Sequence, residues 1–140
     1  MYLIVGGCGQ GKLSWLRKRE EIHGKIADGA VCSVQEAESC AVLDHFHLLV
    51  RRLLEEGKPS SEILSWIESI CDKNPYLIVL SDEIGCGIVP LEKSERDWRE
   101  TVGRACCILA ERSERVDRIV CGIGIRLKEG GRPCFQSWPF

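Results

Sequence analysis

The sequence predicts an α/β domain in which helices cover both faces of a mostly parallel sheet. Short apolar runs alternate along the chain with longer amphipathic segments, and the runs end in glycines or polar residues. Continuous apolar runs are typical of parallel strands that are buried on both faces, and their alternation with helices indicates three layers. A chain of 140 residues is close to the commonest domain size, so we expect a single domain over residues 1–140.

The first part of the chain begins with a strand, a glycine-rich loop and a helix. Residues 2–5 are an apolar run that glycines end, and residues 13–22 form a helix of mixed charge. Residues 26–27 and 30–34 are weaker strand candidates, separated by a turn signal at Asp28-Gly29.

The next part of the chain repeats the pattern of strand and helix. Residues 39–44 form a buried strand that ends in a carboxylate, and residues 46–56 form a helix that Gly57 closes. A serine cap within residues 59–62 opens another helix. We expect that helix to stop before Asn74-Pro75, because a residue that precedes proline disfavours the helical conformation.

The second half of the chain continues the alternation as far as a tail with no clear pattern. A polar triplet and a glycine-rich loop separate its first strand from a long amphipathic helix. The segments in order are a strand at 76–80, the triplet 81–83, the loop 84–90, the helix 94–112, a strand at 115–121, residues 123–127 as either a further strand or its continuation, and the unassigned tail 129–140.

The segment GGCGQGKL follows the first expected strand and satisfies the spacing G-x-x-x-x-G-K. In such a loop glycines let backbone N–H groups turn toward phosphate oxygens, the following helix adds its positive end, and Lys12 supplies a charge for the β and γ phosphates. The predicted nucleotide-binding residues are Gly6, Gly7, Cys8, Gly9, Gln10, Gly11, Lys12 and Leu13. A plain tight turn is the alternative, but it requires neither this many glycines nor a lysine.

Leu13 stands where the working motif has a hydroxyl group that ligates Mg²⁺. Leucine can neither ligate a metal nor form a hydrogen bond through its side chain. Ser14 lies about 100° farther round the helix and should not replace that hydroxyl without rearrangement. We therefore expect Mg²⁺ to depend on carboxylates and water, or to be held weakly.

Carboxylates follow two of the expected strands and should meet at one edge of the sheet. Asp44 ends the strand at 39–44, and Asp82 and Glu83 follow the strand at 76–80. In parallel sheets such residues hold metal or substrate at the carboxyl edge, although each could instead cap a helix or a turn. The predicted catalytic residues are Lys12, Asp44 and Glu83, with Asp44 as the Mg²⁺ ligand and Asp82 as a weaker candidate.

Composition excludes several classes of function. The formal net charge of −2 gives no general basic surface for nucleic acid. The nine cysteines include no C-x-x-C pair, so we interpret them as buried free thiols in a reducing compartment rather than as zinc ligands. The apolar start MYLIV is too short for a signal peptide or a membrane span. We therefore expect a cytoplasmic location.

Residues 81–128 resemble the bacterial bifunctional adenosylcobinamide kinase/adenosylcobinamide-phosphate guanylyltransferase family of cobalamin biosynthesis. That family carries a T-N-E-V-G-x-G-I-V-P segment, a helix with the pattern R-x-x-R-D-x-x-G-R-x-N-Q-x-L-A, and a strand that runs into a glycine and a final lysine. The matching residues here are Glu83, Gly85, Gly87, Ile88, Val89, Pro90, Gly103, Arg104, Leu109, Ala110, Gly122 and Lys128. Together with the N-terminal glycine loop and the segment AVLDHFHLLVRRLL, the resemblance covers about residues 1–22 and 40–128.

The resemblance implies a RecA-like P-loop NTPase fold, often assembled as a homotrimer. It implies two activities: phosphorylation of the aminopropanol hydroxyl of cobinamide, a corrinoid, by ATP or GTP with Mg²⁺, and transfer of GMP to that phosphate through a guanylylated histidine. Lys12 would then hold the phosphates, and Asp44 and Glu83 would serve metal or substrate. The residues implied for a substrate-binding loop and the helix after it are Gly85, Gly87, Pro90 and Arg104.

The sequence departs from the family in the region that carries the guanylylated histidine. Family members have a longer insert with an H-x-x-x-R-P-like segment, whereas only residues 25–39 stand here, and His23 lacks the flanking pattern. His45 and His47 are interpreted as helix caps or core-facing residues. The family's Asn-Gln pair is replaced by Cys106-Cys107. We therefore expect that guanylyl transfer is lost.

Two hypotheses of different class follow. The first is a reduced kinase that moves phosphate from a purine nucleotide to a cobinamide-like alcohol. The second is a catalytically silent nucleotide-binding sensor or assembly protein of the same fold. Both predict purine nucleotide binding, so only turnover with Mg²⁺ separates them. A P-loop phosphohydrolase unrelated to corrinoids would not explain the resemblance of residues 81–128.

Overall fold

Seven strands form one mixed sheet in the computed structural model, which describes residues 1–85 and 87–134. The strands are β1 (Tyr2–Gly6), β2 (Ile26–Asp28), β3 (Val42–Asp44), β4 (Ile78–Asp82), β5 (Arg115–Val120), β6 (Ile123–Glu129) and β7 (Arg132–Pro133). The helices are α1 (Lys12–Arg19), α2 (Val34–Ser39), α3 (Phe46–Glu55), α4 (Ser60–Lys73) and α5 (Lys93–Arg112).

The sheet is mostly parallel, as the sequence predicted. Its order is β2-β3-β4-β1-β5-β6-β7, and the pairs from β2 to β5 are parallel. Strands β6 and β7 join the sheet in the antiparallel direction. In the register of β1 and β4, Gly6 lies beside Asp82, so the carboxyl ends of the two central strands are level.

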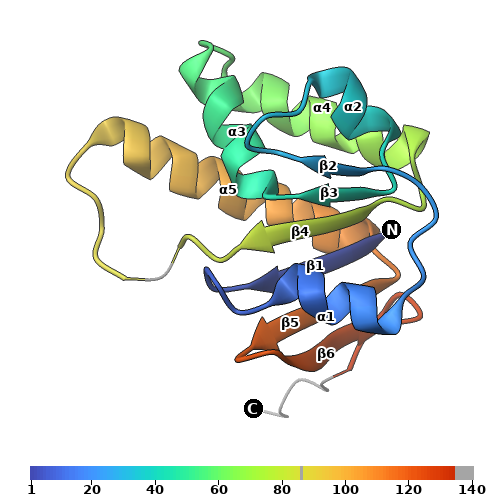
Figure 1. The fold of residues 1–140 in the computed structure, drawn as a ribbon. Coiled ribbons are helices and arrows are strands. Elements are labelled where there is room, and N and C mark those ends of the chain that lie inside the picture. The colour runs from blue at the N-terminus through green and yellow to red at the C-terminus, as the bar shows by residue number, and fades with distance from the viewer. Residues whose placement is uncertain (86, 135–140) are drawn as a thin grey trace.

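Helices lie on both faces of this sheet (Figure 1). Helix α1 packs on one face, where Trp15 and Leu16 join a cluster with Tyr2 and Ile4 of β1. Helices α3, α4 and α5 pack on the other face over a larger cluster that includes Leu3 of β1. Each fully buried leucine or isoleucine in these clusters contributes about 1.5–3 kcal/mol relative to an exposed one.

The strand predicted at residues 30–34 is wrong. Strand β2 stops at Asp28, whose side-chain Oδ1 accepts from the Ala30 N–H (2.9 Å) and whose carbonyl accepts from the Cys32 N–H (2.8 Å). An aspartate that binds the backbone two residues ahead favours a turn over continued sheet pairing. The chain therefore leaves the sheet at this point.

Helix α2 was not predicted, and it shortens the strand expected at 39–44. Ser33 and Glu36 form a reciprocal capping box, in which the Ser33 side chain accepts from the Glu36 N–H and the Glu36 side chain accepts from the Ser33 N–H. This box satisfies two free backbone donors at the start of the helix. The helix takes up Ser39, so β3 starts only at Val42.

The strand expected at 76–80 begins later in the structure, and Asp82 is part of it. Tyr76 is 88% exposed and lies in a turn that the hydrogen bond from the Leu77 N–H to the Asn74 carbonyl (3.2 Å) closes. Ser81 and Asp82, which were expected to follow the strand, instead pair with Val5 and Gly6 of β1.

Two helix ends also differ from expectation. Helix α1 ends at Arg19 rather than at residue 22. The predicted serine cap of α4 is wrong, because Pro59 occupies the cap position and Ser60 is already the first residue of the helix. The Ser60 hydroxyl instead pairs with the Thr101 hydroxyl of α5 (2.9 Å).

Residues 123–127, left open by the sequence, belong to a separate strand. Cys121 and Gly122 adopt left-handed backbone conformations (φ 51° and 75°), which form a turn that matches the twist of an antiparallel hairpin. Part of the unassigned tail then forms β7, and residues 135–140 lie outside the described residues.

The thiols only partly follow the expectation of burial. Cys32, Cys40 and Cys71 are buried, and burial raises the pKa of each. Cys8, Cys107, Cys121 and Cys134 are exposed. None of the helices in the described part of the chain has the length and apolarity that crossing a membrane requires.

Candidate functional site

The candidate site lies where β1 and β4 end, at the reversal point of the sheet. The helix that follows β1 packs on one face, and the helix that follows β4 packs on the other. Adjacent parallel strands whose helices leave to opposite faces open a crevice at their carboxyl ends, which is the usual ligand position in open α/β sheets.

The glycine-rich loop connects β1 to α1 at this crevice. Gly6 is required where the loop begins, because a Cβ atom there would lie 2.5 Å from the Ile119 carbonyl oxygen of β5. Gly11 is the N-cap of α1, and among the described residues no side chain caps that end. The N–H groups of the first helical turn therefore remain available to an anion.

Gln10 ties the loop to the β5–β6 hairpin. Its side-chain Oε1 accepts from the Cys121 N–H (2.6 Å), and its carbonyl accepts from the Gly122 N–H (3.0 Å). Sequence reasoning had no signal for this contact, since the partners are 111 positions apart. The hairpin thus fixes the loop on the side away from β4.

Lys12 is buried at the first position of α1, with 9% of its surface exposed. Its ammonium group donates to the carbonyls of Gly6 (3.3 Å) and Gly7 (2.9 Å) and pairs with Asp82 Oδ1 at 2.5 Å. The sequence analysis ranked Asp82 below Asp44 and Glu83, but in the structure Asp82 is the carboxylate that pairs with Lys12.

His47, at the second position of α3, is the other partner of Asp82. Its Nδ1 accepts from the Asp82 N–H (3.2 Å), and its Nε2 lies 3.3 Å from Asp82 Oδ2. Because a backbone N–H only donates, Nδ1 carries no proton, and the proton of the neutral imidazole lies on Nε2. Burial lowers the pKa of His47, which keeps the ring neutral.

Asp44 lies at the end of β3, on the same edge of the sheet. Its Oδ1 accepts from the His45 N–H (2.8 Å), and its carboxylate is 14% exposed. His45 adopts a left-handed conformation (φ 50°) as the N-cap of α3, and its ring reaches Asp28 Oδ1 (2.9 Å). A hydrogen bond from the Ala30 N–H, followed by the contact with His45, lowers the pKa of Asp28.

Glu83 pairs with β5 rather than with the loop lysine. Its carboxylate accepts two hydrogen bonds from the Arg118 guanidinium (2.8 and 3.0 Å), and its N–H donates to the Gly6 carbonyl (2.9 Å). The structure therefore gathers Lys12, Asp44 and Glu83 at one edge of the sheet, but with Asp82 as the residue in contact with the lysine.

Leu13, at the position where the motif has a hydroxyl group, makes apolar contacts. Leu13 is half-buried and packs against the cluster around Leu16, whereas Ser14 is exposed. The described residues contain no group of three or more histidine, cysteine, aspartate or glutamate side chains that could hold a metal. Any Mg²⁺ bound here would need ligands from phosphate and water.

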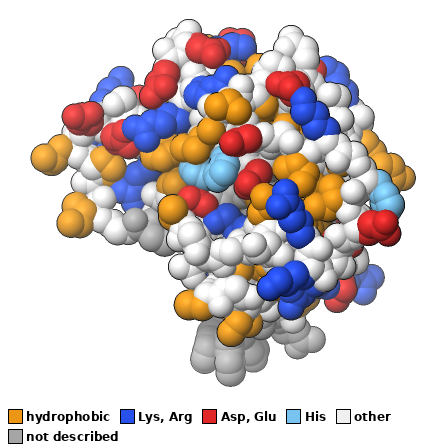
Figure 2. Space-filling model, viewed as in Figure 1, with side chains coloured by type: hydrophobic (Ala, Val, Ile, Leu, Met, Phe, Trp, Pro, Cys, Tyr) orange, Lys and Arg blue, Asp and Glu red, His pale blue; other side chains and the backbone are white. Residues whose placement is uncertain are grey.

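Acidic, basic and histidine side chains border one another on this face of the molecule. Figure 2 shows a histidine patch near the middle of the view, next to both red and blue side chains, where Figure 1 places the start of α3.

The glycine-rich loop after β4 is bound by the start of α5. Arg99 donates to the carbonyls of Gly85 (2.7 Å) and Ile88 (2.7 Å), and Arg96 donates to the Pro90 carbonyl (3.0 Å). Ile88 and Leu91 are almost fully exposed in this segment. Gly85, Gly87 and Pro90 therefore form a surface loop next to the crevice.

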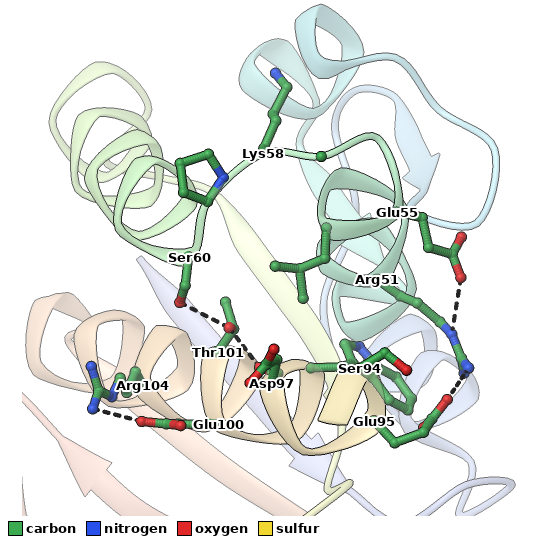
Figure 3. A pocket seen from close by; sticks show the side chains of 14 residues that line it. Arg51, Glu55, Lys58, Ser60, Ser94, Glu95, Asp97, Glu100, Thr101 and Arg104 are labelled. Carbon is green, nitrogen blue, oxygen red and sulfur yellow. Dashed lines mark hydrogen bonds and ion pairs between the residues drawn. The ribbon is translucent and has the colours of Figure 1, made fainter. Parts of the chain in front are cut away.

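Arg104 lies elsewhere, in the wall of a separate pocket of about 480 Å³ between α3, α4 and α5 (Figure 3). Arg104 pairs with Glu100 (2.6 Å), and Arg51 contacts both Glu55 and Glu95. Trp98 also lines the pocket, and its indole N–H donates to the His47 carbonyl (2.8 Å). One hydrogen bond therefore joins the pocket wall to the histidine of the candidate site.

Comparison with known proteins identifies similar chains. The model of the cobinamide kinase/cobinamide phosphate guanyltransferase family matches residues 14–127. The matched range begins after the glycine loop.

Three relatives with curated descriptions are also similar. The chain is 37% identical over 70 residues to the bifunctional adenosylcobalamin biosynthesis protein CobU of Escherichia coli strain K12, a match that covers 49% of this chain and 38% of the relative. It is 37% identical over 59 residues to the protein of the same name from Salmonella typhimurium, covering 41% and 33%. It is 26% identical over 140 residues to the bifunctional adenosylcobalamin biosynthesis protein CobP of Pseudomonas aeruginosa, covering 91% and 81%. The matches to the two enterobacterial relatives thus span about a third of the length of each relative.

Proposed function

The chain belongs to the cobinamide kinase/cobinamide phosphate guanyltransferase family, and from this premise we propose that it is a P-loop nucleotide-binding protein with a RecA-like fold. In this proposal it binds ATP or GTP at residues 6–13 and phosphorylates the hydroxyl group of a cobinamide-like corrinoid. Guanylyl transfer is lost.

The position of Lys12 carries the proposal. A buried lysine at the first turn of a helix, directly after a glycine loop and at the carboxyl end of a central strand, is the arrangement that holds β and γ phosphates. The N–H groups at the start of α1 supply further donors.

Phosphoryl transfer requires positioning and charge neutralisation more than covalent chemistry. Lys12 would neutralise charge on the transferred group, and the loop N–H groups would orient the polyphosphate. Asp44 and Glu83 would serve the metal or the acceptor alcohol, whose approach the loop with Gly85, Gly87 and Pro90 would guide. In this proposal Arg104 contributes to acceptor binding from the neighbouring pocket.

The donor set suits Mg²⁺ only in part. Mg²⁺ accepts one or two carboxylates together with phosphate oxygens and water, which Asp44 and a bound nucleotide would supply. Leu13 offers no ligand. When bound, the ion would neutralise charge between the β and γ phosphates, and this chain would hold it mainly through Asp44.

The loss of guanylyl transfer has support in the region between α1 and β2. His23 is 80% exposed and has Glu21 as a partner at 3.6 Å. It therefore lies outside the crevice formed by the ends of β1 and β4, unlike a nucleophile that must reach a bound nucleotide.

A second candidate function is a catalytically silent nucleotide-binding sensor or assembly protein. The observation that favours it is Leu13, which packs in the apolar cluster where a metal-binding hydroxyl would stand. Such a protein would bind nucleotide and change partner affinity without turnover.

Mass-resolved phosphoryl transfer tests the proposal. Purified protein is incubated with ATP or GTP, Mg²⁺ and cobinamide, and the products and the intact protein are weighed by mass spectrometry. The kinase predicts cobinamide phosphate without a GMP adduct on the protein. Nucleotide binding by calorimetry with neither product would establish the silent alternative, and a GMP adduct would refute the loss of the second activity.

Matched variants assign the activity to the loop. Lys12→Ala should abolish nucleotide binding, whereas Lys18→Ala, at an exposed position of the same helix, should not change it. Leu13→Thr should raise Mg²⁺-dependent nucleotide affinity by about tenfold, the effect of one added metal ligand of about 1.4 kcal/mol. An unchanged affinity would count against the loop as a phosphate cradle.

We further propose, on the family resemblance, that the chain is one domain over residues 1–140, assembles as a homotrimer and is cytoplasmic. Light scattering after size-exclusion chromatography would measure the mass of the particle. A single species at the mass of one chain would refute the trimer.

A further inference from the structure

All three donors of the Lys12 ammonium group have acceptors within the protein. An ammonium carries three N–H donors, and three acceptors surround it: the Gly6 carbonyl, the Gly7 carbonyl and Asp82 Oδ1. The side chain is folded back under its own loop and is almost fully buried. A phosphate oxygen that binds Lys12 must therefore displace or share one of these acceptors.

Asp82 is the acceptor that competes most strongly with phosphate. It is the charged one of the three, its oxygen is the closest to the ammonium, and its side chain is only 15% exposed. A charge-assisted hydrogen bond of this kind is roughly twice as strong as one to a neutral carbonyl. The carboxylate also repels an incoming polyphosphate.

His47 determines where the Asp82 carboxylate lies. One ring nitrogen accepts from the backbone N–H of Asp82 and the other lies 3.3 Å from its free carboxylate oxygen. The ring is itself fixed, because it is 5% exposed and the His47 carbonyl accepts from the Trp98 indole of α5. Asp44, His45 and Lys12 are the other charged or titratable groups that face this ring.

We propose that His47 is a positioning residue: it holds the Asp82 carboxylate so that this carboxylate keeps Lys12 retracted until a polyphosphate displaces it. The order of interaction is His47 to Asp82 to Lys12, from α3 through β4 to the phosphate loop. The role of this arrangement of His47, Asp82 and Lys12, called the lysine lock below, in nucleotide binding rests on the function proposed above. The pairing of Lys12 with Asp82 does not.

Two substitutions of His47 separate positioning from packing. The amide oxygen of asparagine can take the place of Nδ1, whereas the amide nitrogen of glutamine can take the place of Nε2. His47→Gln therefore keeps an N–H group near the Asp82 carboxylate, and His47→Asn loses it. Both replace the ring by a smaller amide, so a role in packing alone predicts similar effects.

The first measurement is the reactivity of Lys12 toward a trace of an amine-acylating reagent, read by mass spectrometry after proteolysis. The reagent needs a neutral, accessible amine, and exposed Lys18 is the internal reference. In the natural protein Lys12 should react at least about tenfold more slowly than Lys18, the effect of one charge-assisted hydrogen bond. His47→Asn and Asp82→Asn should remove most of this protection, and His47→Gln should retain it.

A control excludes general unfolding. Cys71 is buried in the core, 4% exposed, so its resistance to maleimide shows that a variant is folded during the assay. Equal reactivity of Lys12 and Lys18 in the natural protein would overturn the lysine lock. Equal behaviour of the glutamine and asparagine variants, both folded, would overturn the positioning role of His47.

The second measurement is the affinity for ATP by calorimetry without divalent metal. His47→Asn should bind ATP more tightly than the natural protein, by up to about tenfold, because the competitor for Lys12 is loosened. His47→Gln should match the natural protein. If none of the proteins binds ATP, the proposed function fails, and the acylation result still decides whether His47 and Asp82 retract the lysine.

Discussion

Asp117 is the buried carboxylate that joins the strands beneath the candidate site, and its replacement should destabilise the protein. It is 1% exposed on β5 and accepts from the Tyr2 hydroxyl of β1, from Arg115 Nε (3.0 Å) and from Arg126 Nε of β6. Burial, followed by the hydrogen bond to Asp117, raises the pKa of Tyr2, so the phenol donates throughout the neutral range.

The expected magnitude follows from the hydrogen bonds that Asp117→Asn weakens or removes. The amide keeps the shape of the carboxylate but turns one acceptor into a donor that faces donors, and it removes the charge from the hydrogen bonds that remain. Each hydrogen bond to a charged group is worth about 1.5–3 kcal/mol. Because both arginines are a quarter or more exposed, water compensates in part, and we expect a loss of about 3 kcal/mol in the free energy of unfolding.

Urea unfolding followed by tryptophan fluorescence measures this loss as a shift of the midpoint at unchanged slope. Glu129→Gln is the matched control, because Glu129 pairs with Arg126 at the surface and is 69% exposed. That change should cost less than about 0.5 kcal/mol. A loss below about 1 kcal/mol for Asp117→Asn, or an equal loss for the control, would refute the view that this carboxylate holds β1, β5 and β6 together.

Three further predictions concern packing, pH and capping. Gly124→Ala should lower the melting temperature through overpacking worth about 1–3 kcal/mol, because the new Cβ would lie 2.3 Å from the Trp15 ring. Gly103→Ala is the control and should raise the melting temperature, because its Cβ would lie in open space on α5. A higher melting temperature for Gly124→Ala would contradict the close packing of Gly124 against Trp15. Burial lowers the pKa of His47 below the ordinary value of about 6.5, so the unfolded chain binds more protons, and the free energy of unfolding should fall as the pH drops from about 7 to 5. His47→Gln should weaken this pH dependence, which urea unfolding at each pH measures. The same pH dependence in the natural protein and in His47→Gln would contradict the prediction. Ser33→Ala should lower the free energy of unfolding by about 1 kcal/mol, because the capping box of α2 is lost. The control Ser65→Ala, at an exposed position, should leave the free energy of unfolding unchanged. Equal losses in the two variants, measured by urea unfolding, would speak against the cap.

The strand, loop and helix around Lys12 were predictable because each signal is local. Gly6 and Gly11-Lys12 lie within one short segment, and the apolar run before them is typical of a buried strand. That β1, β3 and β4 end at the same edge of the sheet also followed from the alternation of strands and helices. The edge that carries the candidate site was therefore expected, although not the hydrogen bonds within it.

The identity of the lysine partner was not predictable, because it depends on where β4 ends. The apolar run 76–80 predicted a strand that stops before the polar triplet, so Asp82 and Glu83 were both expected after the strand, with Glu83 as the stronger candidate. In the structure sheet pairing with Gly6 continues through Asp82. Successive residues of an extended chain point to opposite sides, so the adjacent carboxylates have different partners: Asp82 pairs with Lys12, and Glu83 pairs with Arg118.

The partners of His47 and Gln10 were out of reach for a different reason. Each side chain has a partner that lies 35 or more positions away, and no local pattern encodes such a distance. The interpretation of His47 as a core-facing residue is correct about its burial. It did not anticipate that the buried ring would hold a carboxylate.

Three contacts of the phosphate loop bear on the choice between the kinase and the silent protein. Gln10 holds the loop to the hairpin, Leu13 holds it to the apolar cluster, and Asp82 holds Lys12. The first two preorganise the cradle and lower the entropy cost of binding phosphate, whereas the third opposes binding until the lysine is released. A kinase must offset that cost in the transition state, where Lys12 would stabilise the charge spread over the transferred group and the leaving phosphate. A silent protein offsets it on binding alone, so its ATP affinity should rise on Asp82→Asn with no turnover in either form.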